Sequence, residues 1–578
     1  MKWAVNPVGS ALKWTKMFSV VLGGIWLMLV PSTVWGFGTD LSQAAKQSLV
    51  EFKADPVGVM NRPLVKRFSP KTSLPVSAMR SELSPEEIFR RKLSVRRQIC
   101  GDQGCTMDPF GLRALMEADD LAENLVDTPE GLVKSLDQVQ NLNLLSGEIS
   151  NQPWSDYYWP VYQGLVGNRY ADGFLFKNEN WLEYLKAAIQ PEKTLLYLWD
   201  NRFRPGEEES FAKQIDRLSP SEKYDLLIGV EDVPAFDKAW QEAVNWSEGD
   251  WPRGYITPWQ WAEGQNYYNS SEKHEVEPWM GLCHGWAGAS YNMPRPEKVV
   301  QVLAADGKTP LKFYPSDIKA LTTYFWAKHR MPARYISGRC NEKEPEQDKD
   351  TGRVLRDECY DTNPGSWHLS VVNQVGKSRR SFVMDSAFDY EVWNQPVKSY
   401  RYIYMNPVTN DTSTDWRKVM VGFDDPATVQ NDVFRKFRLK KKEFYNDRPN
   451  MKPKYLVAVL MEVGYLAETL PVQAPKDSPS EDAVSYVQYM YDLELNEQGE
   501  ILGGEWYSNM HPDFLWNVPA GVVEEKAYYT YLDRVLEGEW SGEAELPPEW
   551  QKSAKLEAIL ESKPLARILD VLIEQSRR

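Results

Sequence analysis

The sequence predicts an α+β fold, with helices in the N-terminal part, a helix followed by an antiparallel sheet in the middle, and many strands in the C-terminal part. Helical periodicity dominates from Asp108 to about Asn245, where "SPSEKYDLLIG" opens with a Ser and a Glu at capping-box spacing. From Lys454 onward strands dominate, and "YMYDLELNEQGEILGGEWY" alternates on both sides of a polar, glycine-containing turn, as a hairpin does. An amphipathic segment from Gln551 to Gln575 predicts a closing helix.

The length and charge of the chain limit what it can bind. A chain of 578 residues can bury a large core and is expected to form more than one domain. Its formal net charge of -15 argues against a phosphate-binding surface, which would need clustered Lys and Arg. We therefore expect no nucleic-acid partner.

The first 36 residues have the pattern of a secretory signal. Lys2, Lys13 and Lys16 precede an apolar run from Met17 to Val30, and small or β-branched residues suited to cleavage end at Gly36. The alternative is a membrane anchor, but the run is shorter than the ~20 apolar residues that a spanning helix needs. We expect cleavage near Gly36, no stable membrane anchor afterwards, and a secreted, extracellular or cell-surface protein in which disulfides persist.

The chain contains five cysteines, an odd number that leaves one thiol without an intramolecular partner. Cys100 and Cys105 flank the short turn "GDQG", and Cys340 and Cys359 flank a charged stretch with no apolar pattern, "NEKEPEQDKDTGRVLRDE". Proximity therefore predicts two local disulfides, the longer one stabilising by on the order of 3 kcal/mol. Cys283 is the thiol left over.

Cys283 lies in "EPWMGLCHGWAGASYN", which predicts a helix beginning near Pro278, a residue suited to a first helical turn. Gly281, Gly285 and Gly288 are spaced four and three apart and would form one smooth face able to lie close to a sheet. Cys283 points away from that face.

Two tryptophans lie on the side of Cys283. Trp279 and Trp286, four residues before and three after it, would wall an apolar slot around the sulfur. The helix N-terminus would favour the thiolate, which is the nucleophilic form. The alternative is a buried structural cysteine in a tightly packed helix.

A nucleophilic thiol needs a base, and the chain has five histidines to supply it. His284 projects about 100° away from its neighbour on a helix, and His329 suits a helix C-terminus. His274 and His511 have no partner visible in the sequence. His368 is distinct, because it lies in "WHLSVVNQVGKSRRSFVMDSAFDY", which contains two strand-like runs around a short turn.

A two-residue turn at Gly376-Lys377 would place His368 directly opposite Asp385. Opposed residues have Cβ atoms ~5 Å apart, close enough for a carboxylate to orient an imidazole. The alternatives are a coincidental cross-strand pair, or a longer turn through Ser378 to Arg380 that would spoil the register.

A cysteine on a helix N-terminus followed by His and Asp on consecutive strands resembles the order of catalytic residues in transglutaminases and papain-like enzymes. The stretch "VWNQPV" is similar to the core of the peptide by which plants recognise the transglutaminase elicitor family of plant pathogens. "MGLCHGW" and "GGEWYSNMHPDFLW" extend the resemblance. The elicitor-like motif comprises Val392, Trp393, Asn394, Gln395, Pro396 and Val397.

This resemblance implies a papain/transglutaminase-like core and a protein-glutamine gamma-glutamyltransferase that forms Gln-Lys isopeptide crosslinks between protein substrates. His368 would take the proton of Cys283, the sulfur would form a thioester with release of ammonia, and a lysine amine would replace the enzyme. Trp279 and Trp286 would keep the thioester dry. The resemblance also implies calcium, although no loop of regularly spaced acids is visible and the metal site is unassigned.

Two other classes of protein stay open. A papain-like cysteine peptidase or a glutamine deamidase would use the same three residues with water as acceptor. A carbohydrate-active or carbohydrate-binding protein would use some of the 23 Trp and 29 Tyr residues, with "WSDYYWPVY" as a stacking platform, although core packing also explains these aromatics.

The expected organisation follows from these patterns. We predict a signal peptide at 1-36, a propeptide or loosely attached N-terminal arm at 37-98, a helical region at 99-270, a catalytic core at 271-440, a β-rich region at 441-540 and a C-terminal helical tail at 541-578.

Overall fold

The structure is a computed structural model. It describes residues 40–68, 121–171, 215–229, 256–257, 259–260, 263, 277–329, 331–340, 342, 344–356, 359, 362–386, 391–439 and 452–578. The predicted signal peptide, His274, Cys100 and Cys105 lie outside these residues. Among the helices that are described, none combines the length and apolar character needed to cross a membrane.

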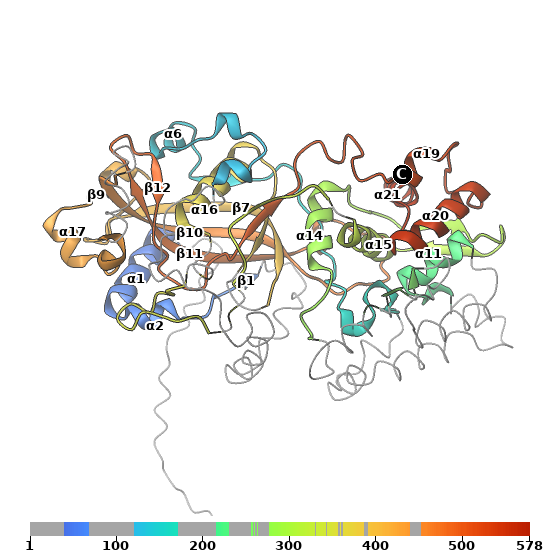
Figure 1. Ribbon diagram of the computed structural model, residues 1–578, viewed down its shortest axis with the longest axis horizontal. Helices are drawn as coiled ribbons and strands as arrows, with labels where there is room; N and C mark the ends of the chain where they lie inside the picture. Colours follow the sequence, from blue (N-terminus) through green and yellow to red (C-terminus); the bar gives the residue numbers. More distant parts are fainter. Residues whose placement is uncertain are drawn as a thin grey trace, which may run out of the picture. The chain divides into compact units, whose positions relative to one another are not determined.

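An antiparallel sheet organises the described chain (Figure 1). The bounds are β1 (Arg67–Phe68), β2 (Ser146–Glu148), β3 (Val300–Leu303), β4 (Pro310–Phe313), β5 (Arg334–Ile336), β6 (Val383–Asp385), β7 (Asn394–Met405), β8 (Thr412–Ser413), β9 (Val421–Gly422), β10 (Tyr455–Ala467), β11 (Ala483–Leu495), β12 (Ile501–Gly503) and β13 (Leu515–Asn517). The main order is β1-β11-β10-β7-β6-β13-β5, with β12, β2, β8 and β9 paired beside it. Two further strands, β3 and β4, form a separate antiparallel pair. The predicted hairpin that starts at Tyr489 is confirmed as β11 and β12.

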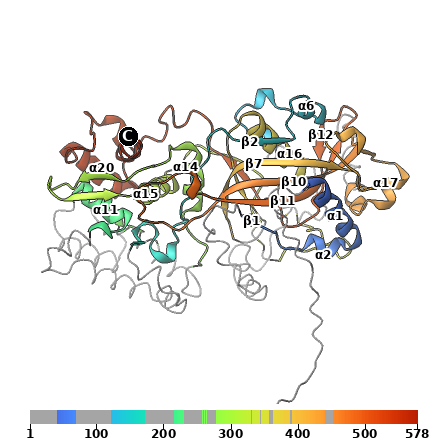
Figure 2. The same ribbon diagram turned by 180° about the vertical axis from the view of Figure 1, so that it is seen from behind.

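Helices flank the sheet and form a second packed region (Figure 2). Their bounds are α1 (Leu41–Ala54), α2 (Pro56–Met60), α6 (Leu136–Asn141), α11 (Pro220–Ile228), α14 (Cys283–Asn292), α15 (Pro315–Lys328), α16 (Pro364–Ser370), the π-helix η8 (Val371–Lys377), α17 (Pro426–Asn431), α19 (Tyr531–Val535), α20 (Pro548–Glu561) and α21 (Ala566–Arg577). The predicted capping box is confirmed at the start of α11, between Ser219 and Glu222. Helices and an antiparallel sheet together confirm the predicted α+β fold.

Strand β10 is buried on both faces, because alternate residues point to opposite sides of a sheet. Val457, Val459 and Met461 belong to one hydrophobic cluster, which also contains residues of α16 and η8. Ala458 and Leu460 belong to another cluster, which also contains residues of α1. The near-continuous apolar sequence of β10 is therefore explained by helices on both sides.

The N-terminal arm is not loosely attached over the part that the structure describes. Helix α1 buries Leu49 and Phe52 among residues of β7, β10 and β11, and Phe52 stacks on Tyr507. Strand β1 adds Arg67 and Phe68 to the edge of β11. The expectation of a loose arm is therefore wrong for residues 41–68, while its removal as a propeptide and the other domain boundaries stay predictions.

The helical segment around Cys283 begins later than predicted. Helix α14 starts at Cys283 itself, and it contacts both α15 and β7. A side chain at Gly285 would overlap the Thr323 backbone and Ala327 of α15, and one at Gly288 would lie 3.1 Å from the rings of Trp326 and Trp516. The glycine face thus allows close packing, as predicted, but its neighbours come mainly from a helix.

The predicted hairpin around Gly376-Lys377 is wrong, because residues 364–377 form α16 and η8. Asn363 caps this helix by accepting a hydrogen bond from the Gly365 backbone, and Pro364 occupies its first position. The apolar run that follows can be buried equally well on a helix, so alternation alone misled the prediction. Asp385 ends β6, whose partners are β7 and β13.

The closing helix is also divided. Helix α20 ends at Glu561 and α21 begins at Ala566, with Pro564 between them. Proline lacks a backbone N–H and its ring clashes with the preceding helical turn, so the helix ends before Pro564. The prediction of one continuous helix from Gln551 to Gln575 is therefore wrong.

Candidate active site

The first turn of α14 is held against an irregular segment of the chain. The Leu282 backbone N–H donates to the Tyr158 carbonyl at 2.6 Å, and a Cβ at Gly281 would lie 2.3 Å from that same oxygen. One turn later, the Trp286 indole donates to the Trp154 carbonyl at 2.8 Å. The backbone at the start of the helix is therefore fixed on both sides of Cys283.

The sulfur of Cys283 is buried against the beginning of β7. Its side chain is 5% exposed, and its thiol lies 3.7 Å from the Val392 carbonyl. The Asn394 amide Nδ2 donates to the sulfur at 3.3 Å, and its Oδ1 accepts a 2.7 Å hydrogen bond from the Trp516 indole. Two residues of the elicitor-like motif thus contact the predicted nucleophile.

Asp385 lies beside these residues, because Asp385 and Asn394 are paired across β6 and β7. The Trp393 backbone N–H donates to Asp385 Oδ1 at 3.2 Å, and the Asp385 backbone is hydrogen-bonded to Phe514 and Asp513. Asp385 is buried, at 1% exposure. The structure therefore brings two of the three predicted catalytic residues to one site.

The electrostatics of this site favour the protonated thiol. Burial raises the pKa of Cys283 to about 11, the hydrogen bonds from Asn394 act against the rise, and the carboxylates of Glu468 and Asp385 add to it. The Gln395 amide donates to Glu468 at 2.9 Å. The predicted effect of the helix N-terminus on the thiolate is thus outweighed by burial and two nearby acids.

His368, the third predicted residue, lies apart from the other two. It is fully buried on α16, its Nδ1 lies 2.8 Å from the Tyr491 hydroxyl, and its ring packs against Tyr402 at 4.8 Å. Burial alone lowers the pKa of His368 to about 3. No hydrogen bond joins it to Cys283 or Asp385, because α16 replaces the strand that would have opposed β6.

The other described histidines have different partners. His284 is exposed. His329 Nδ1 lies 3.0 Å from Lys563 Nζ, and burial together with the lysine charge lowers the pKa of His329 to about 4. The His511 ring stacks on Trp506 at 4.9 Å. Among the described residues, no histidine is hydrogen-bonded to Cys283.

The two tryptophans predicted beside the sulfur have hydrogen-bond partners of their own. Trp286 is buried with its indole on Trp154, and the half-buried Trp279 donates to Glu277 at 2.5 Å. Neither makes a hydrogen bond to the sulfur, and their role as walls of a slot stays a prediction. The tryptophan tied to Cys283 through Asn394 is Trp516, 233 residues further along the chain, which no local spacing could have revealed.

The segment suggested as a platform for stacking sugars belongs to the hydrophobic core. In "WSDYYWPVY", Trp154, Tyr157, Tyr158 and Trp159 are each no more than 2% exposed and share one hydrophobic cluster. A stacking platform must present ring faces to solvent, so this segment does not support the carbohydrate alternative.

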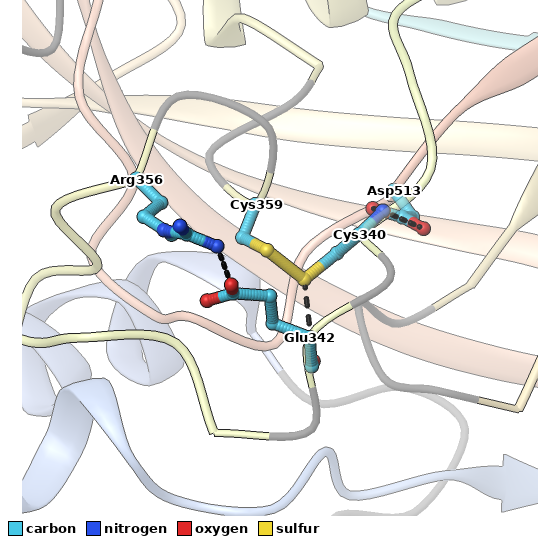
Figure 3. Close-up of a disulfide and its surroundings, with 5 residues drawn as sticks. All are labelled: Cys340, Glu342, Arg356, Cys359 and Asp513. Atoms are coloured by element: carbon cyan, nitrogen blue, oxygen red, sulfur yellow. Dashed lines mark hydrogen bonds and ion pairs between the residues drawn. A yellow bond between two sulfur atoms is a disulfide. The ribbon is translucent and has the colours of Figure 1, made fainter. Parts of the chain in front are cut away.

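The predicted disulfide between Cys340 and Cys359 is confirmed (Figure 3). Cys283 is free. Within the loop that the disulfide closes, Arg356 pairs with Glu342. The Cys340 backbone N–H donates to the Asp513 carboxylate at 3.1 Å. Because Asp513 is in turn bonded to Asp385, the crosslinked loop is connected to the candidate site.

A calcium site is not evident in the part of the chain that the structure describes. No group of three or more His, Cys, Asp or Glu side chains there could hold a metal ion. Asp348 and Asp350 lie together, but Lys436 Nζ pairs with both carboxylates at 2.6 and 3.0 Å. Since the lysine already pairs with both carboxylates, we do not assign calcium to this acidic pair, and the calcium that the resemblance implies stays a prediction.

The comparisons with known proteins show what this region is similar to. Residues 263–527 match the family model described as transglutaminase elicitor. The matched range contains Cys283, the elicitor-like motif, Asp385 and Trp516, so the resemblance predicted from the sequence is confirmed.

One solved structure was also found, the GP42 transglutaminase from Phytophthora sojae, at 19% sequence identity and a TM-score of 0.37. The similarity covers 67% of this chain and 86% of that one. The search of curated proteins gave no match.

Proposed function

We propose that the chain is a secreted protein-glutamine gamma-glutamyltransferase that forms Gln-Lys isopeptide bonds through a thioester on Cys283. The observation that carries the proposal is the position of this thiol. It is free, buried at the first residue of α14, and bonded to the strand that follows Asp385, within the segment that matches the family.

The reaction balances without an added oxidant or reductant. The thiol proton is removed, the sulfur bonds to the carboxamide carbon of a protein glutamine, and the carbon–nitrogen bond breaks as ammonia leaves with that proton. A lysine ε-amine then bonds to the same carbon, the carbon–sulfur bond breaks, and the thiol is restored. Burial of the sulfur supports aminolysis, because water reaches a dry thioester poorly.

The proposed reaction needs a base that removes the proton of Cys283. A thiol with a pKa near 11 is protonated at neutral pH, so a base must act in the attacking step. Asp385 lies beside the sulfur, whereas His368 is hydrogen-bonded to the Tyr491 hydroxyl. The role of His368 as general base therefore stays a prediction from the sequence.

Incorporation of a fluorescent primary amine into a glutamine-rich protein tests the proposal. The wild-type protein should label the acceptor covalently, and Cys283→Ala should not, while it keeps a near-native melting temperature. Arms with calcium and with chelator test the calcium requirement implied by the family resemblance. Ammonia release without labelling would indicate a deamidase, and cleavage of the acceptor protein would indicate a peptidase.

A further inference from the structure

Asn394 is the described side chain that donates a hydrogen bond to the Cys283 sulfur. It lies at the first position of β7, is 5% exposed, and bonds the sulfur through Nδ2 at 3.3 Å. Its Oδ1 accepts a hydrogen bond from the Trp516 indole at 2.7 Å. Because an indole nitrogen can only donate, this bond fixes the amide oxygen toward Trp516 and leaves the N–H group for the sulfur.

Trp516 is itself held in place from two sides. Its backbone pairs with Tyr335 of β5 and Val383 of β6, and its ring stacks on the Tyr335 ring at 6.0 Å. Gly288 of α14 leaves room for this ring, since a Cβ there would lie 3.1 Å from it. The Trp516 indole is therefore fixed in the position from which it donates its hydrogen bond to the Asn394 amide oxygen.

The charges around the sulfur explain why a donor is needed there. The carboxylates of Glu468 and Asp385 both disfavour a second anion, and burial removes the water that would solvate it. A hydrogen bond from a neutral amide stabilises an anionic sulfur more than a neutral one, at no further cost in buried charge.

We propose that Asn394 is a catalytic residue that stabilises the anionic sulfur of Cys283, and that Trp516 is the positioning residue that orients its amide toward the sulfur. This inference rests on the proposed role of Cys283 as nucleophile. Asn394 is the third residue of the elicitor-like motif. The proposal therefore places part of this motif in the wall of the reactive site.

The test measures the alkylation of Cys283 by iodoacetamide in the folded, full-length protein. The rate is followed across pH by mass spectrometry of the Cys283 peptide, for wild type, Asn394→Ala and Asn394→Asp. Both variants should react about 10- to 100-fold more slowly at a fixed pH on the rising part of the profile, as expected for loss of a hydrogen bond to a charged group. Alanine also opens the pocket, so a change in access alone would speed its reaction.

Trp516→Phe keeps most of the ring and removes the N–H that orients Asn394, so it should slow alkylation in the same direction by a smaller factor. Trp540→Phe is the matched control, because Trp540 is 5% exposed and its indole also donates one hydrogen bond, to Ala544 at 2.9 Å. This control should react like wild type.

An unchanged or faster rate in both Asn394 variants, with melting temperatures near that of wild type, would overturn the proposal. If those variants fail to fold, the test compares the alkylation rates of Trp516→Phe and Trp540→Phe. Equal rates in these two variants would reject the proposal. The readout is independent of the transferase reaction. Slower alkylation in a protein that incorporates no amine would keep the role of Asn394 and reject the proposed function.

Discussion

The position of His368 can be tested through its titration, because the two possible surroundings shift its pKa in opposite directions. On α16 it is fully buried against Tyr491 and Tyr402, and burial lowers its pKa to about 3. Beside Asp385, as the predicted hairpin required, the carboxylate would favour the imidazolium and raise the pKa instead. The structure therefore predicts a histidine that stays neutral throughout the range in which an ordinary one titrates.

The magnitude follows from linkage. In the unfolded chain His368 binds a proton near pH 6.5, but the folded protein binds it only near pH 3, so the unfolded state binds more protons in between and stability rises with pH there. The contribution is complete above about pH 6.5 and is lost progressively on acidification. At 1.36 kcal/mol per pH unit, lowering the pH from 6.5 to 5 should cost roughly 2 kcal/mol from this residue.

Two measurements check this prediction. Histidine-selective isotope labelling with NMR detection resolves few signals in a chain with five histidines, and His368→Asn identifies the one that disappears. Denaturant unfolding between pH 7 and pH 5 should show a weaker pH dependence in His368→Asn than in wild type. A His368 signal that titrates near or above pH 6.5, with equal pH dependence of stability in both proteins, would refute the placement of His368 on α16.

Two further changes probe the neighbours of Cys283. Asp385→Asn removes a negative charge that raises the pKa of the thiol, so alkylation of Cys283 should accelerate by about tenfold at a fixed pH, and slower alkylation would contradict the placement of Asp385. In the same variant, a fall of amine incorporation by several orders of magnitude would support a triad role. Gly281→Ala would set a Cβ 2.3 Å from the Tyr158 carbonyl and should lower the unfolding free energy by about 1–3 kcal/mol, measured by denaturant titration. Wild-type stability in that variant would show that the first turn of α14 is not held as described.

Local sequence signals predicted those features that depend on neighbouring residues. The Cys340–Cys359 disulfide follows from proximity, the β11–β12 hairpin from alternation around a polar turn, and the α11 cap from Ser219 and Glu222. The free thiol at Cys283 follows from the odd cysteine count together with the proximity of the other cysteines in two pairs. Each of these inferences needed only a few residues of context.

Features that depend on distant parts of the chain could not be predicted in this way. The register that places Asp385 beside Asn394 is set by β7 and β13, and the indole that orients Asn394 comes from β13. The strand predicted at His368 is wrong because Asn363 and Pro364 start a helix there, ahead of a short apolar alternation. Residues 371–375 are all buried on η8, so the sequence there marks no exposed face, and tertiary packing decides between helix and strand.

The central claim is that Cys283 carries an acyl group from glutamine. Incubating the protein with a glutamine-containing peptide, without an amine acceptor, and quenching in acid should trap the intermediate for mass spectrometry. The claim predicts an adduct on the Cys283 peptide with the mass of the substrate less ammonia, lost on addition of a primary amine and absent from Cys283→Ala. An adduct on another residue, or amine incorporation that persists in Cys283→Ala, would contradict it.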